Sequence, residues 1–222
     1  MKAGNRSYDR PADLPAVMPV FPLAAALLLP RADMPLNIFE SRYLAMVDTA
    51  FCGERVIGMV QPDESAAASL NGPALCRVGC AGRITSFAET GDGRYMINLT
   101  GVARFRIVEE LSANTPFRQC RVTAAPFAAD FRAGSGEAAV DRGSVLRTFC
   151  AYLKAHSLDA DWESVGRASN ETLVNALAMM APFGPAEKQA LLEAPDLRAR
   201  AETLVAITEM SLAGEARGRP LH

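Results

Sequence analysis

Apolar residues in the first half of the chain recur at every second position, which is the period of a strand with one buried face. The clearest case follows the Gly-Asp-Gly turn at residues 91–93, where Tyr95, Ile97 and Leu99 fall on one face. The run before the turn is also rich in β-branched and aromatic residues, as strands are. The two runs and the turn between them predict a β-hairpin.

Gly101 interrupts the second strand of this hairpin, as a glycine at a bulge or bend does. Beyond it, Ala103 and Phe105 alternate with Arg104 and Arg106. The alternation predicts that the apolar groups point into a core and that both guanidinium groups point outward.

Other runs of the same kind predict further strands: Val20–Leu29, Met34–Phe39, Arg55–Val60, Leu75–Gly82 and Phe117–Ala124. A helix is embedded among them, because apolar residues from Tyr43 to Phe51 recur at three- and four-residue spacing and Gly53 follows as a helix stop. Six or seven short strands with one embedded helix predict a small, curled, barrel-like sheet.

The second half of the chain has the period of helices. Val145, Phe149 and Tyr152 lie on one side of a long predicted helix, and prolines at 185 and 195 separate the later helices. The fold class is therefore α+β, a small β-barrel followed by a C-terminal helical bundle. The expected parts are a flexible N-terminus at 1–17, the barrel at 18–125, a linker at 126–136, the bundle at 137–214 and a flexible tail at 215–222.

Composition and charge narrow the function. The formal net charge is -2 and the sequence pI is near 5.8, which gives no chain-wide electrostatic reason to expect nucleic acid or an anionic membrane as a partner. The first 18 residues lack the apolar segment of a secretory signal, and the five cysteines are an odd and scattered set. Both features are typical of a cytoplasmic protein with reduced thiols.

The chain offers no set of residues for ATP hydrolysis or peptide cleavage. Its three lysines are Lys2, Lys154 and Lys188, and none follows a glycine as the lysine of a phosphate-binding loop does. Ser144 and Lys154 are ten residues apart on one predicted helix, so they cannot form a nucleophile and base pair. The sequence predicts a protein that is not an enzyme.

Metal or cofactor binding is not expected either. Cys76 and Cys80 lie on a predicted strand, where their sulfurs would be about 13 Å apart at roughly 3.3 Å per residue. The two histidines, His156 and His222, do not complete a zinc site with them.

Three segments carry a resemblance to a known family. They are "PVFPLAAALLLPRADMPLNIFESRYLAMV" (19–47), "VGCAGRITSFAETGDGRYMINLTGVARFRI" (78–107) and "KQALLEAPDLRARAETL" (188–204). In this order and spacing they resemble the N-terminal substrate-binding domain of the Lon protease family, in its stand-alone bacterial form without the ATPase and peptidase domains. The resemblance implies a PUA-like β-barrel, a helical bundle and a module that binds protein or peptide segments.

The cluster Phe39-Glu40-Ser41-Arg42-Tyr43 is interpreted as a structural hinge between a strand and the embedded helix. Phe39 would end an inward-facing strand, and Tyr43 would start the buried face of the helix. Charge-assisted bonds between Glu40 and Arg42 would fix the turn, although Arg104 is an alternative partner for Glu40.

Two groups of apolar residues are candidates for polypeptide binding. The first lies on the predicted strands and the second at a helix end, where methionines adapt to varied partners: Phe21, Met34, Leu36 and Ile38, then Met179, Met180 and Phe183. The alternative for the strand residues is that they fill the barrel core.

RNA binding is the alternative function, because PUA-like barrels are shared with RNA-binding proteins. Five arginines could line one face of the sheet: Arg94, Arg104, Arg106, Arg118 and Arg121. The 25 acidic residues balance the basic ones, and the aromatic residues that stack on bases are not interleaved with the arginines. A continuous basic face would support RNA, and an exposed apolar groove would support polypeptide.

Overall fold

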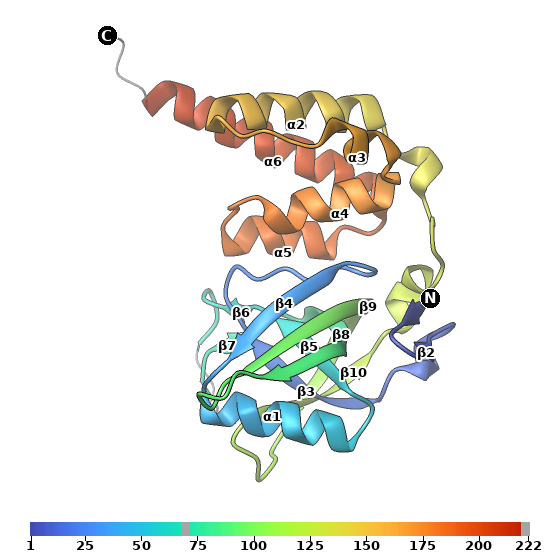
Figure 1. Ribbon diagram of the computed structural model, residues 1–222, viewed down its shortest axis with the longest axis vertical. Coiled ribbons are helices and arrows are strands. Elements are labelled where there is room, and N and C mark those ends of the chain that lie inside the picture. Colours follow the sequence, from blue (N-terminus) through green and yellow to red (C-terminus); the bar gives the residue numbers. More distant parts are fainter. Residues whose placement is uncertain (68–71, 219–222) are drawn as a thin grey trace. The chain divides into compact units, whose positions relative to one another are not determined.

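A computed structural model describes residues 1–67 and 72–218. The chain divides into two compact units, a sheet unit from Met1 to Ala133 and a helical unit that begins at Gly134. Figure 1 shows the strands in the first unit and a group of helices in the second.

The sheet unit contains six strands in the order β10-β3-β5-β8-β9-β4. Their bounds are β3 Val17–Pro22, β4 Asp33–Ile38, β5 Val56–Val60, β8 Val78–Glu89, β9 Tyr95–Leu111 and β10 Arg118–Thr123. β10 also pairs with β9, so five of the strands form a hydrogen-bonded circuit and β4 lies outside it, against the first half of β9. The β3–β5 pair is parallel and the other pairs are antiparallel.

The predicted hairpin at residues 83–111 is confirmed as β8 and β9, and β9 passes through Gly101 without ending. The register shifts there, because Ala81 is opposite Ala103 while Gly82 is opposite Gly101, which leaves Val102 as the extra residue of a bulge. Gly101 exchanges two backbone hydrogen bonds of 2.8 Å with the loop that precedes β4. A side chain at this position would collide with the carbonyl oxygen of Leu29.

The strand predicted at Val20–Leu29 is wrong beyond Pro22, where β3 ends. The backbone of Ala25 has a positive φ of 58°, which turns the chain out of the strand direction. Leu27, Leu28 and Leu29 are nevertheless 2%, 1% and 0% exposed. The apolar run therefore encodes a buried loop.

The first 17 residues, for which the sequence predicts a flexible N-terminus, contain short elements of secondary structure. They form a small hairpin of β1 (Lys2–Ala3) and β2 (Arg6–Ser7) and a short 3-10 helix, η1 (Pro11–Asp13). The side chain of Tyr8 is 0% exposed, and the guanidinium group of Arg83 on β8 donates to its hydroxyl oxygen at 3.3 Å. The hairpin is fixed to the sheet because Ala3 and Tyr8 are part of the hydrophobic core.

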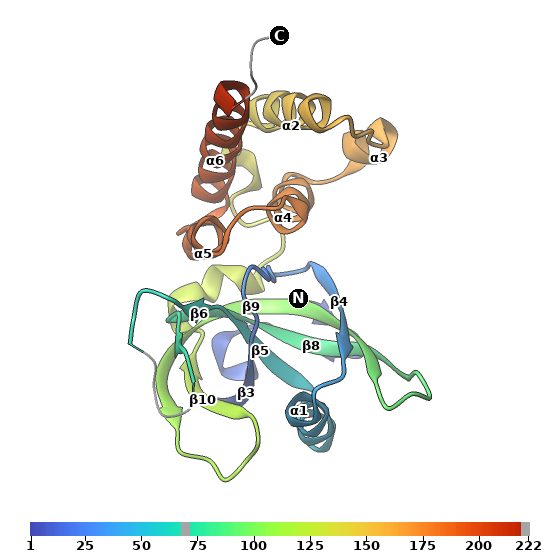
Figure 2. The ribbon, with the colours of Figure 1, turned by 90° about the vertical axis from the view of Figure 1, so that its left-hand side faces the viewer.

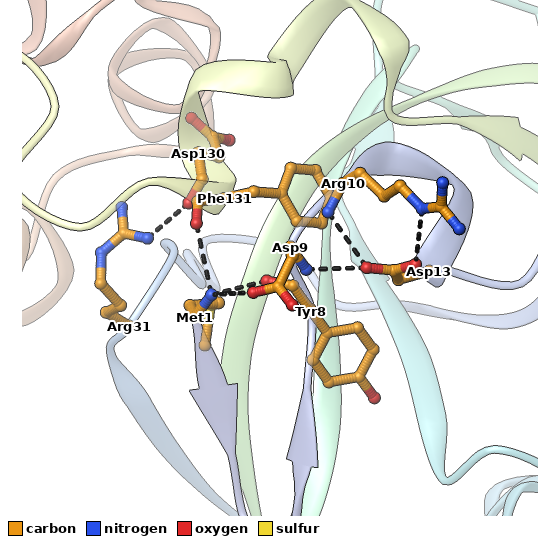
Figure 3. Close-up of polar contacts among 8 residues, drawn as sticks. All are labelled: Met1, Tyr8, Asp9, Arg10, Asp13, Arg31, Asp130 and Phe131. Atoms are coloured by element: carbon orange, nitrogen blue, oxygen red, sulfur yellow. Dashed lines mark hydrogen bonds and ion pairs between the residues drawn. The ribbon is translucent and has the colours of Figure 1, made fainter.

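Hydrogen bonds to backbone oxygens and to carboxylates hold this N-terminal segment in place (Figure 3). The ammonium group of Met1 donates to the carbonyl oxygens of Tyr8 at 2.5 Å and Phe131 at 3.3 Å. The Asp13 carboxylate accepts from the backbone N–H groups of Asp9 at 2.7 Å and Arg10 at 3.1 Å. These bonds hold the segment in its own conformation and connect it to Phe131, 130 positions further along the chain than Met1.

The expected linker at 126–136 is also largely part of the sheet unit. It contains η2 (Ala125–Phe131), whose Phe127, Asp130 and Phe131 are buried. The Asp130 carboxylate accepts two bonds of 2.8 Å from the guanidinium group of Arg104. Figure 3 shows the other contact of this residue, in which Arg31 donates to the Asp130 carbonyl oxygen. Arg104 is only 3% exposed, so the predicted outward orientation holds for Arg106 and is wrong for Arg104.

The embedded helix is confirmed as α1 (Ser41–Cys52), with Gly53 at its C-terminal cap. It buries Tyr43, Met46, Val47 and Ala50. The sheet unit also contains a minor pair of strands, β6 (Pro62–Asp63) and β7 (Ala74–Leu75).

The helical unit is built from short helices around one long helix (Figure 2). After η3 (Glu137–Ala139) come α2 Arg142–His156, α3 Trp162–Arg167, α4 Asn170–Met180, α5 Pro185–Glu193 and α6 Leu197–Gly218. α6 packs against α2, α4 and α5. It runs through the first part of the tail that was expected to be flexible, and the rest of that tail, 219–222, lies outside the described residues. In the described ranges, no helix is both long and apolar enough to cross a membrane.

Candidate functional site

An apolar groove in the helical unit has a volume of about 500 Å³. Its walls come from α2, α3, α4 and α6, whose arrangement can be followed in Figure 2, and from the segment between α2 and α3. The apolar lining residues are Val145, Phe149, Tyr152, Leu153, Leu158, Ala160, Val165, Leu173, Ala176, Leu177, Met180, Ala181, Leu204 and Val205.

One wall of the groove is a stripe of apolar side chains on α2, of which some are buried and others partly exposed. Val145 and Leu153 are buried, whereas Phe149 and Tyr152 at the same helical face are partly exposed. A stripe at i, i+4 and i+7 normally covers a core. Here its buried members fill the bundle and its partly exposed aromatic members line the groove.

The floor carries few polar atoms that would need a partner. Leu173 of α4 and Leu204 of α6 are 5% and 3% exposed. Thr208 also lines the floor, but its hydroxyl donates to the carbonyl oxygen of Leu204 at 2.7 Å. Since that hydroxyl is satisfied within its own helix, the floor favours apolar groups.

The rim carries large apolar side chains that reach into solvent. Leu158 is 52% exposed and Met180 is 78% exposed. Trp162 lies outside the lining, is 51% exposed, and has its ring centroid 6.2 Å from that of Phe149. Apolar groups that gather around a groove, unlike single exposed ones, mark an interaction surface.

Among the described lining residues, the charged ones are Asp159 and Asp161. Asp161 caps α3, and its carboxylate accepts from the Ser164 hydroxyl at 2.6 Å and from the backbone N–H groups of Glu163 and Ser164. These bonds, led by the hydroxyl of Ser164, hold the pKa of Asp161 below its ordinary value. The rim is therefore negatively charged at neutral pH.

The groove contains one of the predicted candidates, Met180. Met179 is partly buried, and its carbonyl oxygen accepts from the Lys188 ammonium group at 3.2 Å. Phe183 is 8% exposed, so it presents little apolar surface. The aromatic residues Phe149 and Tyr152 were predicted on one helix face, and the sequence gives no signal that they border a groove.

The structure corrects two of the strand candidates. Phe21 and Ile38 are 7% and 2% exposed, and the ring centroid of Phe21 lies 4.3 Å from that of Tyr43. They fill the core, which is the alternative that the sequence left open. Met34 and Leu36 on β4 are partly exposed.

At the start of α1, Glu40 and Arg42 are in contact and Tyr43 is buried. The Arg42 guanidinium group donates to the Glu40 carboxylate at 2.7 and 3.0 Å and lies 4.5 Å from the centre of the Tyr43 ring. Phe39 differs, since it is 63% exposed. Ile38 occupies the inward position at the end of β4, so the next residue points outward.

The sheet unit also has an exposed aromatic patch. Phe87 is 40% exposed and contacts Phe51 and Tyr95 edge to face, at centroid separations of 4.9 and 5.0 Å. The guanidinium group of Arg55 lies over the Phe51 ring at 5.4 Å from its centroid. Because these rings are packed on one another and one of them is partly covered by a cation, the helical groove is the stronger candidate site.

The arginines that could have formed an RNA-binding face are mostly paired with carboxylates. Arg118 contacts Glu110 at 2.5 Å, Arg121 contacts Glu109 at 2.9 Å and Arg94 contacts Asp92 at 3.2 Å. Arg104 is buried with Asp130. Of the five, Arg106 is exposed. These five arginines therefore do not form a continuous basic face.

A comparison with models of known protein families identifies the family of this chain. A family model of the ATP-dependent protease La (LON) substrate-binding domain matches residues 17–209. The chain belongs to this family. The Lon-family resemblance of the sequence is thereby confirmed.

Curated relatives and solved structures agree with the family. The chain is 27% identical to the Lon protease of Syntrophus aciditrophicus (strain SB), over 90% of this chain and 26% of that protein. It is 28% identical to Lon protease 2 of Myxococcus xanthus, over 85% of this chain and 23% of that protein. The chain thus spans about a quarter of the length of these two Lon proteases.

Two solved structures share the fold of this Lon-family chain. The Lon N-terminal domain protein from Xanthomonas campestris has a TM-score of 0.61 at 21% identity, over 86% of this chain and 97% of that one. The N-terminal domain of Mycobacterium avium complex Lon protease has a TM-score of 0.64 at 20% identity, over 87% of this chain and 98% of that one. Both structures are Lon N-terminal domains, and this chain shares their mixed α/β fold.

Proposed function

We propose that this Lon-family domain binds polypeptide segments in the groove of its helical unit and catalyses no reaction itself. The observation that carries the proposal is the apolar groove between α2, α3, α4 and α6, with exposed Leu158 and Met180 at its rim. Its volume of about 500 Å³ lies in the range of sites that bury a few apolar groups of a ligand, about 300–1,000 Å³.

The free energy of binding would come from apolar side chains that leave water. Burial of apolar area contributes roughly 25 cal/mol per Å² before the costs of ordering the ligand. Unfolded proteins expose such side chains in every sequence, which suits a module that accepts varied partners. Met180 supports this, because a thioether side chain adapts its shape to different neighbours.

Several features support a non-catalytic role. Ser144 and Lys154 are both on α2, ten residues apart, as the sequence predicts. Within the described residues, no group of three or more His, Cys, Asp or Glu side chains is placed to hold a metal ion. A cytoplasmic location suits such a module.

We also propose that the circuit of β10, β3, β5, β8 and β9 is a PUA-like barrel. The pairing of β10 with both β3 and β9 supports this interpretation. The RNA-binding alternative gains no support, since four of its five candidate arginines contact carboxylates.

The proposed function is tested by titrating the purified chain into a fluorescently labelled, chemically unfolded protein and, in parallel, into a labelled single-stranded RNA. We expect polypeptide binding that persists as salt is raised, because apolar burial is not screened. RNA binding that weakens steeply with salt, without polypeptide binding, would replace the proposal with its alternative.

A further inference from the structure

The groove is walled by side chains of helices. Apart from the segment 158–161 and Ala181, every lining residue lies in α2, α3, α4 or α6. The backbone N–H and C=O groups inside a helix are already bonded to one another. The walls therefore offer few backbone partners to a ligand.

This restricts the conformation of a bound chain. An extended segment would carry its own N–H and C=O groups into an apolar groove, and each group left without a partner there is costly. A helix satisfies these groups internally and presents apolar side chains at i, i+3 or i+4, and i+7. The groove is thus suited to a helix rather than to a strand.

The charge of the lining restricts the sequence of the ligand. Asp159 and Asp161 lie together on the segment that borders the groove between α2 and α3. Asp159 is exposed, and Asp161 is exposed while it caps α3. A basic side chain beside the apolar face of the ligand would meet this end, whereas an acidic one would be repelled.

We propose that the groove takes an amphipathic helix that has a lysine or arginine next to its apolar face, and that Asp159 and Asp161 select this charge. The inference rests on the proposed polypeptide-binding function and specifies the class of segment that is bound. The domain would then prefer helix-forming, basic segments among the apolar stretches of an unfolded chain.

The test uses synthetic peptides of about 18 residues, long enough to form a helix in water. One peptide has a leucine face flanked by lysines, the second replaces the lysines by glutamates, and the third has the lysines and a central proline that breaks the helix. Trp162 is the single tryptophan of the chain and lies beside Phe149, so its fluorescence reports binding without a label.

We expect the lysine peptide to bind about fivefold more tightly than the glutamate peptide at low salt, with a smaller ratio at high salt. The proline peptide should bind about tenfold more weakly than the lysine peptide or not at all. D159K places a lysine beside Asp161 and should therefore remove most of the difference between the lysine and glutamate peptides. The control E209K makes the same charge change at an exposed residue of α6 outside the lining, and should leave the order unchanged.

Equal binding of the lysine and glutamate peptides to the parent, or an undiminished preference for the lysine peptide in D159K, would overturn the charge selection. Equal binding of the proline peptide would overturn the helical ligand. If an unfolded protein still binds in these cases, this inference fails and the proposed function stands. If neither peptides nor unfolded protein bind, both fail.

Discussion

At the scale of single residues, the environment of a side chain depends on partners that are distant in the sequence. Arg104 and Arg106 occupy similar places in the alternation of β9, yet Arg104 is buried and Arg106 is exposed. The difference comes from Asp130, which lies 26 residues further along the chain and brings a carboxylate to Arg104. A pattern of period two carries no information about such a partner.

Replacement of Asp130 should therefore be costly. D130A leaves the guanidinium group of Arg104 buried without its carboxylate, and we expect the free energy of unfolding to fall by about 3–5 kcal/mol. The control is E109A, which removes the partner of Arg121 from a pair whose side chains are 50% and 54% exposed. That change should cost about 1 kcal/mol or less in urea unfolding. Equal losses in the two variants would contradict this account of Arg104.

The cysteines allow a second test at this scale. Burial, with a smaller effect of the Glu110 charge, raises the pKa of Cys120 from 9.0 to about 11. Cys52 and Cys150 are exposed. A thiol reagent at pH 8 should modify these two rapidly and Cys120 only after unfolding, because the thiolate is the reactive form.

The same shift has a consequence for stability. The unfolded chain ionises this thiol near pH 9, while the folded chain resists ionisation until about pH 11. The contribution of Cys120 to stability is therefore complete below pH 9 and is lost as the pH rises through 11. Rapid modification of Cys120 by the thiol reagent in the native protein would contradict the burial of this side chain.

At the scale of elements, the sequence predicts strands and helices where local signals are strong. The Gly-Asp-Gly turn and the spacing from Tyr43 to Phe51 predict the β8–β9 hairpin and α1. The run Leu23–Leu29 misleads, because continuous apolar residues indicate burial but do not distinguish a strand from a packed loop. The hairpin of β1 and β2 is missed because its residues are polar, and it is held by contacts such as Tyr8 with Arg83.

Gly101 tests how the loop before β4 is attached to β9. In G101A the new methyl group would meet the carbonyl oxygen of Leu29, so we expect a loss of about 1–3 kcal/mol from overpacking. G166A makes the same change within α3, where nothing lies within 4 Å of the new atom. It should stabilise the protein by up to about 1 kcal/mol through helix propensity. Thermal unfolding of both variants measures whether each change raises or lowers the stability. An unchanged stability in G101A would contradict the close attachment of this loop to β9.

At the scale of the whole molecule, the sequence predicts the family and the order of a sheet unit and a helical unit. It does not predict the groove, because the groove is formed by residues from 145 to 208 that each resemble ordinary core positions. Met180 is anticipated through its neighbour Met179 and the flexibility of methionine. Phe149 and Leu158 are not, since only the arrangement of four helices leaves them at an edge.

The central claim is that apolar side chains of the groove hold a polypeptide, and two methionines test it most directly. Met180 lines the groove and is 78% exposed, whereas Met210 on α6 is 75% exposed and lies outside the lining. M180Q and M210Q make the same polar change at equal exposure, so neither should disturb folding. In a titration against an unfolded protein, M180Q should bind about threefold to tenfold more weakly than the parent, and M210Q should bind as the parent does. Equal affinities for all three proteins would contradict the groove as the binding site.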